Sequence, residues 1–176
     1  MASATSPGYW ADVKTDYDPS MKFTTYKTFA MSLDTKIPDD MLAQDDIVRK
    51  RVINSIETQL IKNGMVKATN PADADLTVVT YAGVKSQVNY STVSTGYGGM
   101  YGYGGYWGGA GYNTQVIANT YREGTLHIDM FDTKQRLLAW RGQAAGALQG
   151  ARTPKERQEI IDAVVYDILK GFPPNQ

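Results

Sequence analysis

Two stretches of the chain repeat apolar residues with the period of an amphipathic helix. The first runs from Asp45 to Asn63 and is followed by Gly64, a residue that tolerates the left-handed conformation of a helix end. Its apolar stripe consists of Val48, Val52, Ile53, Ile56, Leu60 and Ile61. We therefore expect a helix with one buried face, begun by an aspartate cap at Asp39–Asp40 or Asp45–Asp46.

The second helical stretch has the clearest start signal in the chain. Thr153-Pro-Lys-Glu156 combines the two ends of a capping box with a proline at the first helical position. Gly171 and the Pro173-Pro174 pair end the stretch. Its apolar face consists of Ile160, Ile161, Val164, Val165, Ile168 and Leu169.

Most of the remaining apolar segments have the alternation or the β-branched and aromatic content of strands. We expect strands over residues 23–33, 76–88, 114–121, 125–131 and 136–147. Tight turns are predicted at Arg122-Glu-Gly124 and at 132–135, which makes residues 114–147 an antiparallel meander.

This order of elements predicts an α+β fold: an antiparallel sheet of about four to five strands with two amphipathic helices packed on one face. Residues 1–15 show no periodicity and are expected to form a flexible N-terminal arm. Residues 16–174 then form a single α+β domain, because 176 residues suit one core. Residues 96–111 are predicted to be a Gly/Tyr-rich loop inserted between two long strands.

The inserted segment is the most unusual part of the composition. Nine of its 16 residues are glycine, and it lies in a stretch from Ser86 to Tyr121 without any charged side chain. It contains neither G-x-G-x-x-G nor a Gly-Lys-Ser/Thr signature, so a phosphate loop is not indicated. Its aromatic side chains are candidates for partner contact, by stacking on sugars or lying at a lipid interface: Tyr97, Tyr101, Tyr103, Tyr106 and Trp107. The alternative is a loop without a fixed ligand.

Charge and cysteine content exclude several classes of function. Lys plus Arg and Asp plus Glu are both 18, and a zero net charge argues against nucleic acid as a partner. The chain has no cysteine, which excludes disulfides, thiolate catalysis, zinc–cysteine sites and iron–sulfur clusters. These observations leave a domain without an indicated cofactor.

His127 and Asp129 are the residues that come nearest to catalytic chemistry. They lie two apart on one face of a predicted strand, a spacing that suits two metal ligands or a histidine–carboxylate pair. Further metal ligands would all have to be carboxylates, and no Gly-x-Ser-x-Gly elbow is present. A strand pair without catalytic function is the simpler interpretation, so the sequence assigns no catalytic and no metal-binding residue.

Other charged groups have simple structural explanations. Asp16 with Asp18, and Asp73 with Asp75, are close acidic pairs that could bind calcium, but each stands beside a proline in a turn. The basic run 49–51 could contact phosphate, but it is spaced for ion pairs with aspartates one helical turn earlier.

Several segments together resemble a bacterial family known as domain of unknown function 4136. They are Thr15-Asp-Tyr-Asp-Pro-Ser20 with Phe23-Thr-Thr-Tyr-Lys-Thr-Phe29, Ala72-Asp-Ala-Asp-Leu76, Tyr121-Arg-Glu-Gly-Thr-Leu-His-Ile-Asp129, Leu138-Ala-Trp-Arg-Gly142 and Ile168-Leu-Lys-Gly-Phe-Pro-Pro174. The resemblance covers about residues 14–174. Members often carry a Gly/Tyr-rich insertion between the middle strands, and the family has no established enzymatic activity or agreed catalytic residues.

The resemblance implies an exported, periplasmic protein, usually a lipoprotein tethered to an envelope membrane through an N-terminal cysteine. Residues 1–8 are small and polar and show no signal segment, so we expect the native gene to encode one, with a cysteine near the start of this chain. The function expected on this basis is a non-enzymatic interaction or envelope-maintenance role, with an envelope protein or glycan as partner. Two alternatives stay open: a carbohydrate-active or hydrolytic envelope protein using carboxylates such as Asp129, and a cytosolic regulator or assembly subunit if Met1 is the natural start.

Overall fold

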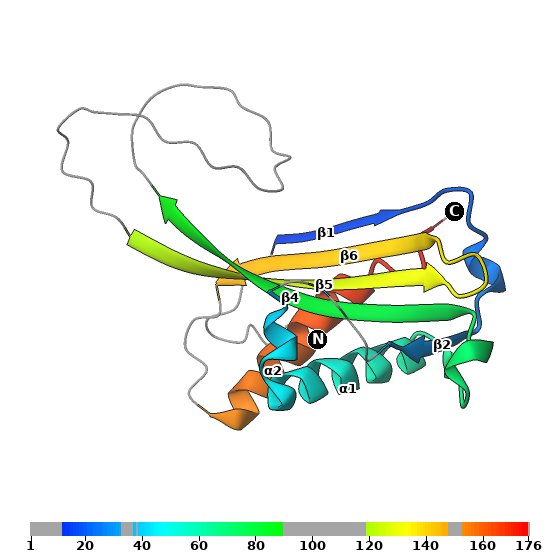
Figure 1. The fold of residues 1–176 in the computed structure, drawn as a ribbon, viewed down its shortest axis with the longest axis horizontal. Coiled ribbons are helices and arrows are strands. Elements are labelled where there is room, and N and C mark those ends of the chain that lie inside the picture. The colour runs from blue at the N-terminus through cyan, green and yellow to red at the C-terminus, as the bar shows by residue number, and fades with distance from the viewer. Residues whose placement is uncertain (1–11, 33–36, 38, 90–118, 148–152, 176) are drawn as a thin grey trace, which may run out of the picture.

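The computed structural model describes residues 12–32, 37, 39–89, 119–147 and 153–175 (Figure 1). The strands are β1 (Asp12–Tyr17), β2 (Thr28–Met31), β3 (Val66–Lys67), β4 (Leu76–Asn89), β5 (Asn119–Asp132) and β6 (Leu138–Ala147). The helices are α1 (Asp46–Lys62) and α2 (Pro154–Leu169), with short 3₁₀ turns at Phe23–Thr25, Met41–Ala43 and Pro71–Asp73. The fold is therefore α+β, as the sequence predicts.

All six described strands form one mixed sheet in the order β1-β6-β5-β4-β2-β3. The pairs β1–β6, β6–β5 and β5–β4 are antiparallel, whereas β2 runs parallel to both β3 and β4. The expectation of a purely antiparallel sheet of four to five strands was therefore wrong in detail. The sheet has six strands because β1 and the short β3, neither of them expected, form its two edges, while the strands expected over 114–121 and 125–131 belong to the single strand β5.

Strands β4 and β5 form the longest pairing in the sheet, from Leu76↔Asp132 to Asn89↔Asn119. The turn predicted at Arg122-Glu-Gly124 does not exist, because β5 passes through these residues without interruption and pairs there with β4. Figure 1 shows the far ends of both strands projecting beyond the helices. The predicted Gly/Tyr-rich loop at 96–111 lies outside the described residues.

Helix α1 begins at the expected cap: the carboxylate of Asp45 accepts hydrogen bonds from the amides of Ile47 and Val48. The predicted stripe faces the sheet, with Val52, Ile56 and Leu60 buried. Ile61, which we expected to widen that stripe, is instead 53% exposed.

Helix α2 has the predicted capping box. Thr153 Oγ1 accepts a hydrogen bond from the amide of Glu156, and the Glu156 carboxylate accepts one from the amide of Thr153. Five residues of its apolar face are buried: Ile160, Val164, Val165, Ile168 and Leu169.

Both described helices lie on the same face of the sheet (Figure 1). Side chains alternate between the two faces of a strand, so Leu76, Val78 and Thr80 point toward the helices. The same face of the other strands contributes Phe29, Ile128, Met130 and Trp140, all fully buried. Of the described helices, neither is long and apolar enough to cross a membrane.

The opposite side of the sheet is named the open face. It carries Val79, Tyr81, Thr125, His127, Asp129, Arg141, Gln143, Asp12, Lys14 and Asp16.

Two segments near the N-terminus differ from expectation. Residues 12–15, which we assigned to a flexible arm, lie in β1 and pair with β6. The strand predicted over 23–33 is divided into a 3₁₀ turn and the four-residue β2, because Phe23 turns into the core beside Phe172, with the two ring centroids 6.0 Å apart.

Candidate functional site

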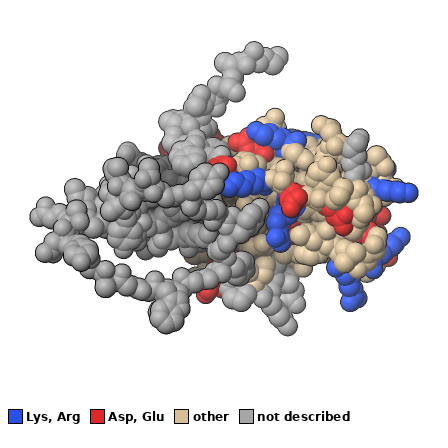
Figure 2. All heavy atoms as spheres, turned by 90° about the horizontal axis from the view of Figure 1, so that it is seen from above, with Lys and Arg blue, Asp and Glu red and all other residues tan. Residues whose placement is uncertain are grey.

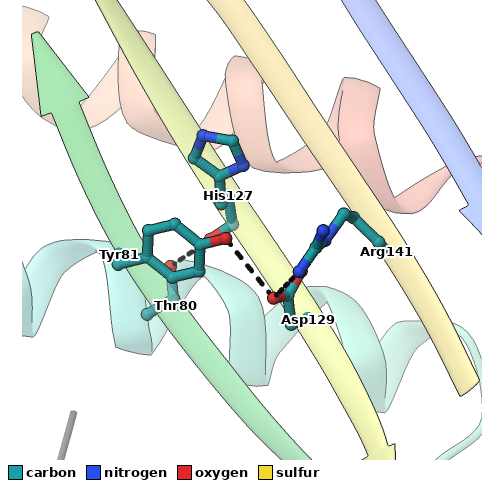
Figure 3. A network of polar contacts seen from close by, with 5 residues as sticks. All are labelled: Thr80, Tyr81, His127, Asp129 and Arg141. Atoms are coloured by element: carbon teal, nitrogen blue, oxygen red, sulfur yellow. Dashed lines mark hydrogen bonds and ion pairs between the residues drawn. The ribbon is translucent and has the colours of Figure 1, made fainter. Parts of the chain in front are cut away.

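The register of the three central strands brings four polar or aromatic side chains together on the open face. Tyr81 of β4 lies opposite His127 of β5, and Asp129 of β5 lies opposite Arg141 of β6. Figure 3 shows this group, which we call the Asp129 cluster. It stands on the middle of the sheet, held by pairing on both sides.

Asp129 and Arg141 form a bidentate ion pair. Arg141 Nε donates to Asp129 Oδ1 and Arg141 Nη2 donates to Asp129 Oδ2, both at 2.7 Å. Asp129 is only 3% exposed, whereas the Arg141 side chain is 44% exposed. The desolvation cost of a buried carboxylate offsets much of the ion-pair attraction, so the pair adds less stability than its short distances suggest.

Tyr81 connects the two halves of the Asp129 cluster. Its hydroxyl donates to Asp129 Oδ2 at 3.4 Å, and its ring is stacked on the His127 imidazole with centroids 4.6 Å apart and planes 7° apart. On the helix side of the same strands, the Thr80 hydroxyl donates to the backbone carbonyl of His127 at 2.9 Å. The position of His127 is therefore fixed from both faces of the sheet.

The surroundings of His127 favour the neutral form of its imidazole. Burial lowers the pKa of its imidazole, and the positive charge of Arg141 lowers it further, against the opposing effect of Asp129. Its Nδ1 atom is buried and has no hydrogen-bond partner in the described structure. A buried nitrogen without a partner costs stability, and the indole nitrogen of Trp140 in the core shares this feature.

The pairing of His127 with Asp129 that the sequence suggested is only partly found. The two residues do share a face, but no hydrogen bond joins their side chains; the Asp129 carboxylate is held by Arg141 and Tyr81 instead (Figure 3). Sequence reasoning missed both partners. A hairpin that turned at 132–135 would place residue 138 opposite Asp129; Arg141 comes there because the β5–β6 pairing begins at Leu138 and shifts register between Met130 and Phe131, and Tyr81 comes from a third strand.

The close acidic pairs have structural roles in the described residues. Burial alone would raise the pKa of Asp75, but hydrogen bonds from the amides of Lys27 and Thr28 and from the Thr28 hydroxyl outweigh it and lower the pKa. Hydrogen bonds from Ser20 lower the pKa of Asp18 in the same way. Asp18 therefore fixes its own turn, as the neighbouring proline suggested, whereas Asp75 joins the start of β4 to the start of β2.

Asp132 has a similar role at the turn between β5 and β6. It accepts hydrogen bonds from the amides of Lys134 and Gln135 and from the Tyr26 hydroxyl. Burial, with the hydrogen bond and charge of Asp132, raises the pKa of Tyr26 to about 12. Within the described part of the chain, no group of three His, Cys, Asp or Glu side chains is placed to hold a metal ion.

Basic and acidic side chains are interspersed on the described surface seen in Figure 2, so that face shows no patch of one sign. The aromatic residues proposed for partner contact, Tyr97, Tyr101, Tyr103, Tyr106 and Trp107, lie outside the described residues. Their role stays a prediction.

Comparison with known families identifies the chain. Residues 13–174 match the family described as a domain of unknown function, DUF4136. The chain belongs to the DUF4136 family. The resemblance read from the sequence is thus confirmed for the family and its approximate bounds. No functionally curated protein matches this DUF4136 chain.

Several solved structures match this chain at low sequence identity, and one of them shows a similar fold. A PDZ domain protein from Parabacteroides distasonis matches 94% of this DUF4136 chain with a TM-score of 0.60 and 17% identity, and this chain spans 36% of that protein's length. A DUF4136 family protein from Bacteroides thetaiotaomicron matches 89% of this chain and 95% of its own, with a TM-score of 0.42 and 16% identity. A PelC dodecamer from Paraburkholderia phytofirmans matches 95% of this chain and 100% of its own, with a TM-score of 0.44 and 12% identity.

Proposed function

We propose that this DUF4136 domain is a non-enzymatic binding module of a bacterial envelope lipoprotein, and that the Asp129 cluster on the open face is its recognition surface. The observation that carries the proposal is the bidentate hold of Arg141 on Asp129, with a distance of 2.7 Å for each hydrogen bond. A carboxylate with both oxygens accepting from a guanidinium is poorly suited to transfer protons or attack a substrate. The same arrangement is well suited to present a fixed guanidinium at a surface.

The geometry also weighs against a hydrolytic role for His127. A histidine that acts as general base is normally oriented by a hydrogen bond from its second nitrogen to a carboxylate or carbonyl. The Nδ1 atom of His127 has no such partner, and its imidazole packs against the Tyr81 ring instead. In a binding module this stack supplies a rigid, partly apolar contact surface beside the charged Arg141.

The partner proposed for this surface is a protein or glycan of the envelope. Tyrosine, histidine and arginine together offer ring edges, hydrogen-bond donors and a positive charge, which suit sugars and the polar surface of a protein. We further propose that the domain is periplasmic and tethered through a lipid on a cysteine encoded near the start of this chain. The aromatic residues between 97 and 107 are proposed to add contact area to the same partner.

An affinity capture experiment from envelope extracts tests this proposal. The immobilised wild-type domain is compared with a Tyr81→Ala/His127→Ala variant and with a matched control, Lys155→Ala/Glu159→Ala, which changes exposed residues of α2 on the other side of the sheet. We expect one set of envelope components that the control retains and the open-face variant loses.

Equal capture by all three proteins would contradict the open face as recognition surface. A variant lacking residues 96–111 separates the contribution of the Gly/Tyr-rich segment from that of the Asp129 cluster. Circular dichroism on each variant verifies that the comparison is between folded proteins.

A further inference from the structure

Strand β1 ends the sheet on one side, and its outer edge is exposed. Five of its six residues are exposed, and among the described strands none pairs with its outer side. The amide of Asp18 donates to the backbone carbonyl of Ala139 in β6. In an antiparallel pair, alternate residues bond to the neighbouring strand, so the amides of Val13, Thr15 and Tyr17 point away from β6. An edge of this kind is a template for another strand.

The two sides of β1 differ in chemistry. On the open face it carries Asp12, Lys14 and Asp16, and on the helix side it carries Val13, Thr15 and Tyr17. Tyr17 is 39% exposed although its ring packs edge-on against Phe23 with centroids 5.9 Å apart. Thus one side of the edge alternates in charge and the other is partly apolar.

We infer that β1 pairs antiparallel with β1 of a second copy of this chain, around a two-fold axis at Thr15. In this register Lys14 lies opposite Asp16 of the second copy, and Val13 lies opposite Tyr17, and each pair occurs twice. Within β1, opposite charges meet on the open face and Val13 meets Tyr17 on the helix side, while Asp12 falls opposite Asp18, one residue beyond the end of β1. The two sheets become one continuous sheet with the helices of both copies on the same side.

Neighbouring registers do not match equally well. A two-fold axis at Lys14 places lysine opposite lysine and Asp12 opposite Asp16, and an axis at Asp16 places two aspartates together. An axis at Val13 pairs only residues 12–14 within the described strand. Like charges directly opposite each other destabilise a strand pair, so the pattern of β1 selects the Thr15-centred register.

The contacts that β1 makes within one copy are easily exchanged. Asp16 Oδ1 accepts a hydrogen bond from the amide of Tyr17 at 2.9 Å, which occupies one of the outward-pointing amides. Lys14 Nζ lies 3.2 Å from Asp12 Oδ2, and both side chains are 55% exposed, so this ion pair contributes little. On pairing, Asp16 moves to Lys14 of the second copy, and the Tyr17 amide bonds to the facing carbonyl of Val13.

Sedimentation of the full chain with three charge variants tests this inference. We expect the wild type to sediment as a dimer. The single variants Lys14→Asp and Asp16→Lys should each weaken dimer association at least about tenfold, because like charges then face each other. The Lys14→Asp/Asp16→Lys double variant should restore association. Lys22→Asp, an exposed lysine outside β1, is the matched control and should dimerise like the wild type. A monomeric wild type, or a double variant that stays as weak as the single ones, would overturn the inference.

A cysteine pair tests the register separately. The chain has no native cysteine, and facing residues of a hydrogen-bonded antiparallel pair have Cα atoms about 5.5 Å apart, within disulfide range. Mild oxidation should therefore link Thr15→Cys into a covalent dimer and leave Val13→Cys largely unlinked. Preferential linking through position 13 would refute the Thr15-centred register. Thermal melts of both variants establish that they are folded.

Discussion

Gly142 of β6 lies where the core allows no side chain, and its replacement by alanine is expected to be strongly destabilising. A Cβ atom at this position would overlap the Trp140 indole and lie 2.5 Å from Ile168 Cγ2 of α2. Neither neighbour can withdraw easily, because Trp140 and Ile168 are both fully buried. The indole is also held by Phe172, whose ring centroid lies 5.4 Å away.

Forcing an extra methyl group into a packed core typically costs about 1–3 kcal/mol, and a contact with two rigid neighbours favours the upper end of that range. We therefore expect Gly142→Ala to lower the free energy of unfolding by about 3 kcal/mol. For a domain of this size that corresponds to a fall in melting temperature of roughly 6–12 °C. Urea unfolding at neutral pH, followed by circular dichroism, measures the free energy directly.

Gly83→Ala is the matched control, because a Cβ at Gly83 of β4 meets nothing within 4 Å. We expect its unfolding free energy to stay within about 1 kcal/mol of the wild type. Ile168→Ala removes the Cγ2 atom that the new methyl group would meet. It should therefore cost about 1–2 kcal/mol less in the Gly142→Ala background than in the wild type. If Gly142→Ala unfolded like Gly83→Ala, the close packing of α2 on β6 would be refuted.

Three further outcomes follow from the same structure. Val52→Asp should lower the unfolding free energy by several kcal/mol in a urea titration, because Val52 is 3% exposed and its replacement buries a charge; a shift of less than about 1 kcal/mol would mean that α1 packs through another face. Arg141→Ala should lower the free energy of unfolding by about 1–3 kcal/mol, a figure already reduced for the exposure of the Arg141 side chain. The double variant Asp129→Ala/Arg141→Ala should lose less than the sum of the two single losses, whereas strictly additive losses would show that the two side chains act independently. The pKa of Asp75 is lower in the folded protein than the value of 3.8 for an unperturbed aspartate, so its ionised carboxylate contributes stability above pH 3.8 that is lost as the pH falls through the folded pKa. The difference in unfolding free energy between wild type and Asp75→Asn, measured in urea, should therefore be large at pH 7 and vanish in strong acid. A difference that does not depend on pH would contradict the lowered pKa.

The parts of the fold that the sequence predicts well are those with strong local signals. Both helices begin at N-capping side chains that accept hydrogen bonds from nearby amides, namely Asp45 for α1 and Thr153 with Glu156 for α2. The long strand β4 is predicted because its alternating apolar residues, such as Leu76 and Val78, face a helix layer. Caps and alternation depend on neighbours in the sequence and are therefore readable from it.

The parts that were missed depend on distant residues. Strand β1 has no apolar alternation, since its charged residues face solvent on an edge, and only its pairing with β6 makes it a strand. The Arg122-Glu-Gly124 segment has the composition of a turn, but β4 supplies a partner for its backbone and the strand continues. The parallel pairing of β2 with β4 requires a return through α1 that periodicity does not reveal.

The candidate site shows the same division. Alternation along one strand places His127 and Asp129 on a common face, and the structure agrees. Their real partners, Tyr81 and Arg141, come from two other strands and are fixed by strand register, which depends on where each hairpin turns. The ion pair of Asp129 with Arg141 and the stack of His127 on Tyr81 are products of those cross-strand contacts, which the spacing of His127 and Asp129 along one strand does not contain.

Site-specific photocrosslinking in living cells tests the central claim, that the open face is the recognition surface, most directly. A photoreactive residue is placed at Gln143, beside His127 in the register of β5 and β6, and in a parallel strain at the exposed Lys155 of α2. The account predicts a discrete adduct with an envelope protein or glycan from position 143, lost when Tyr81 and His127 are replaced by alanine, and no such adduct from position 155. Equal adducts from both positions, or an adduct from position 155 alone, would contradict it.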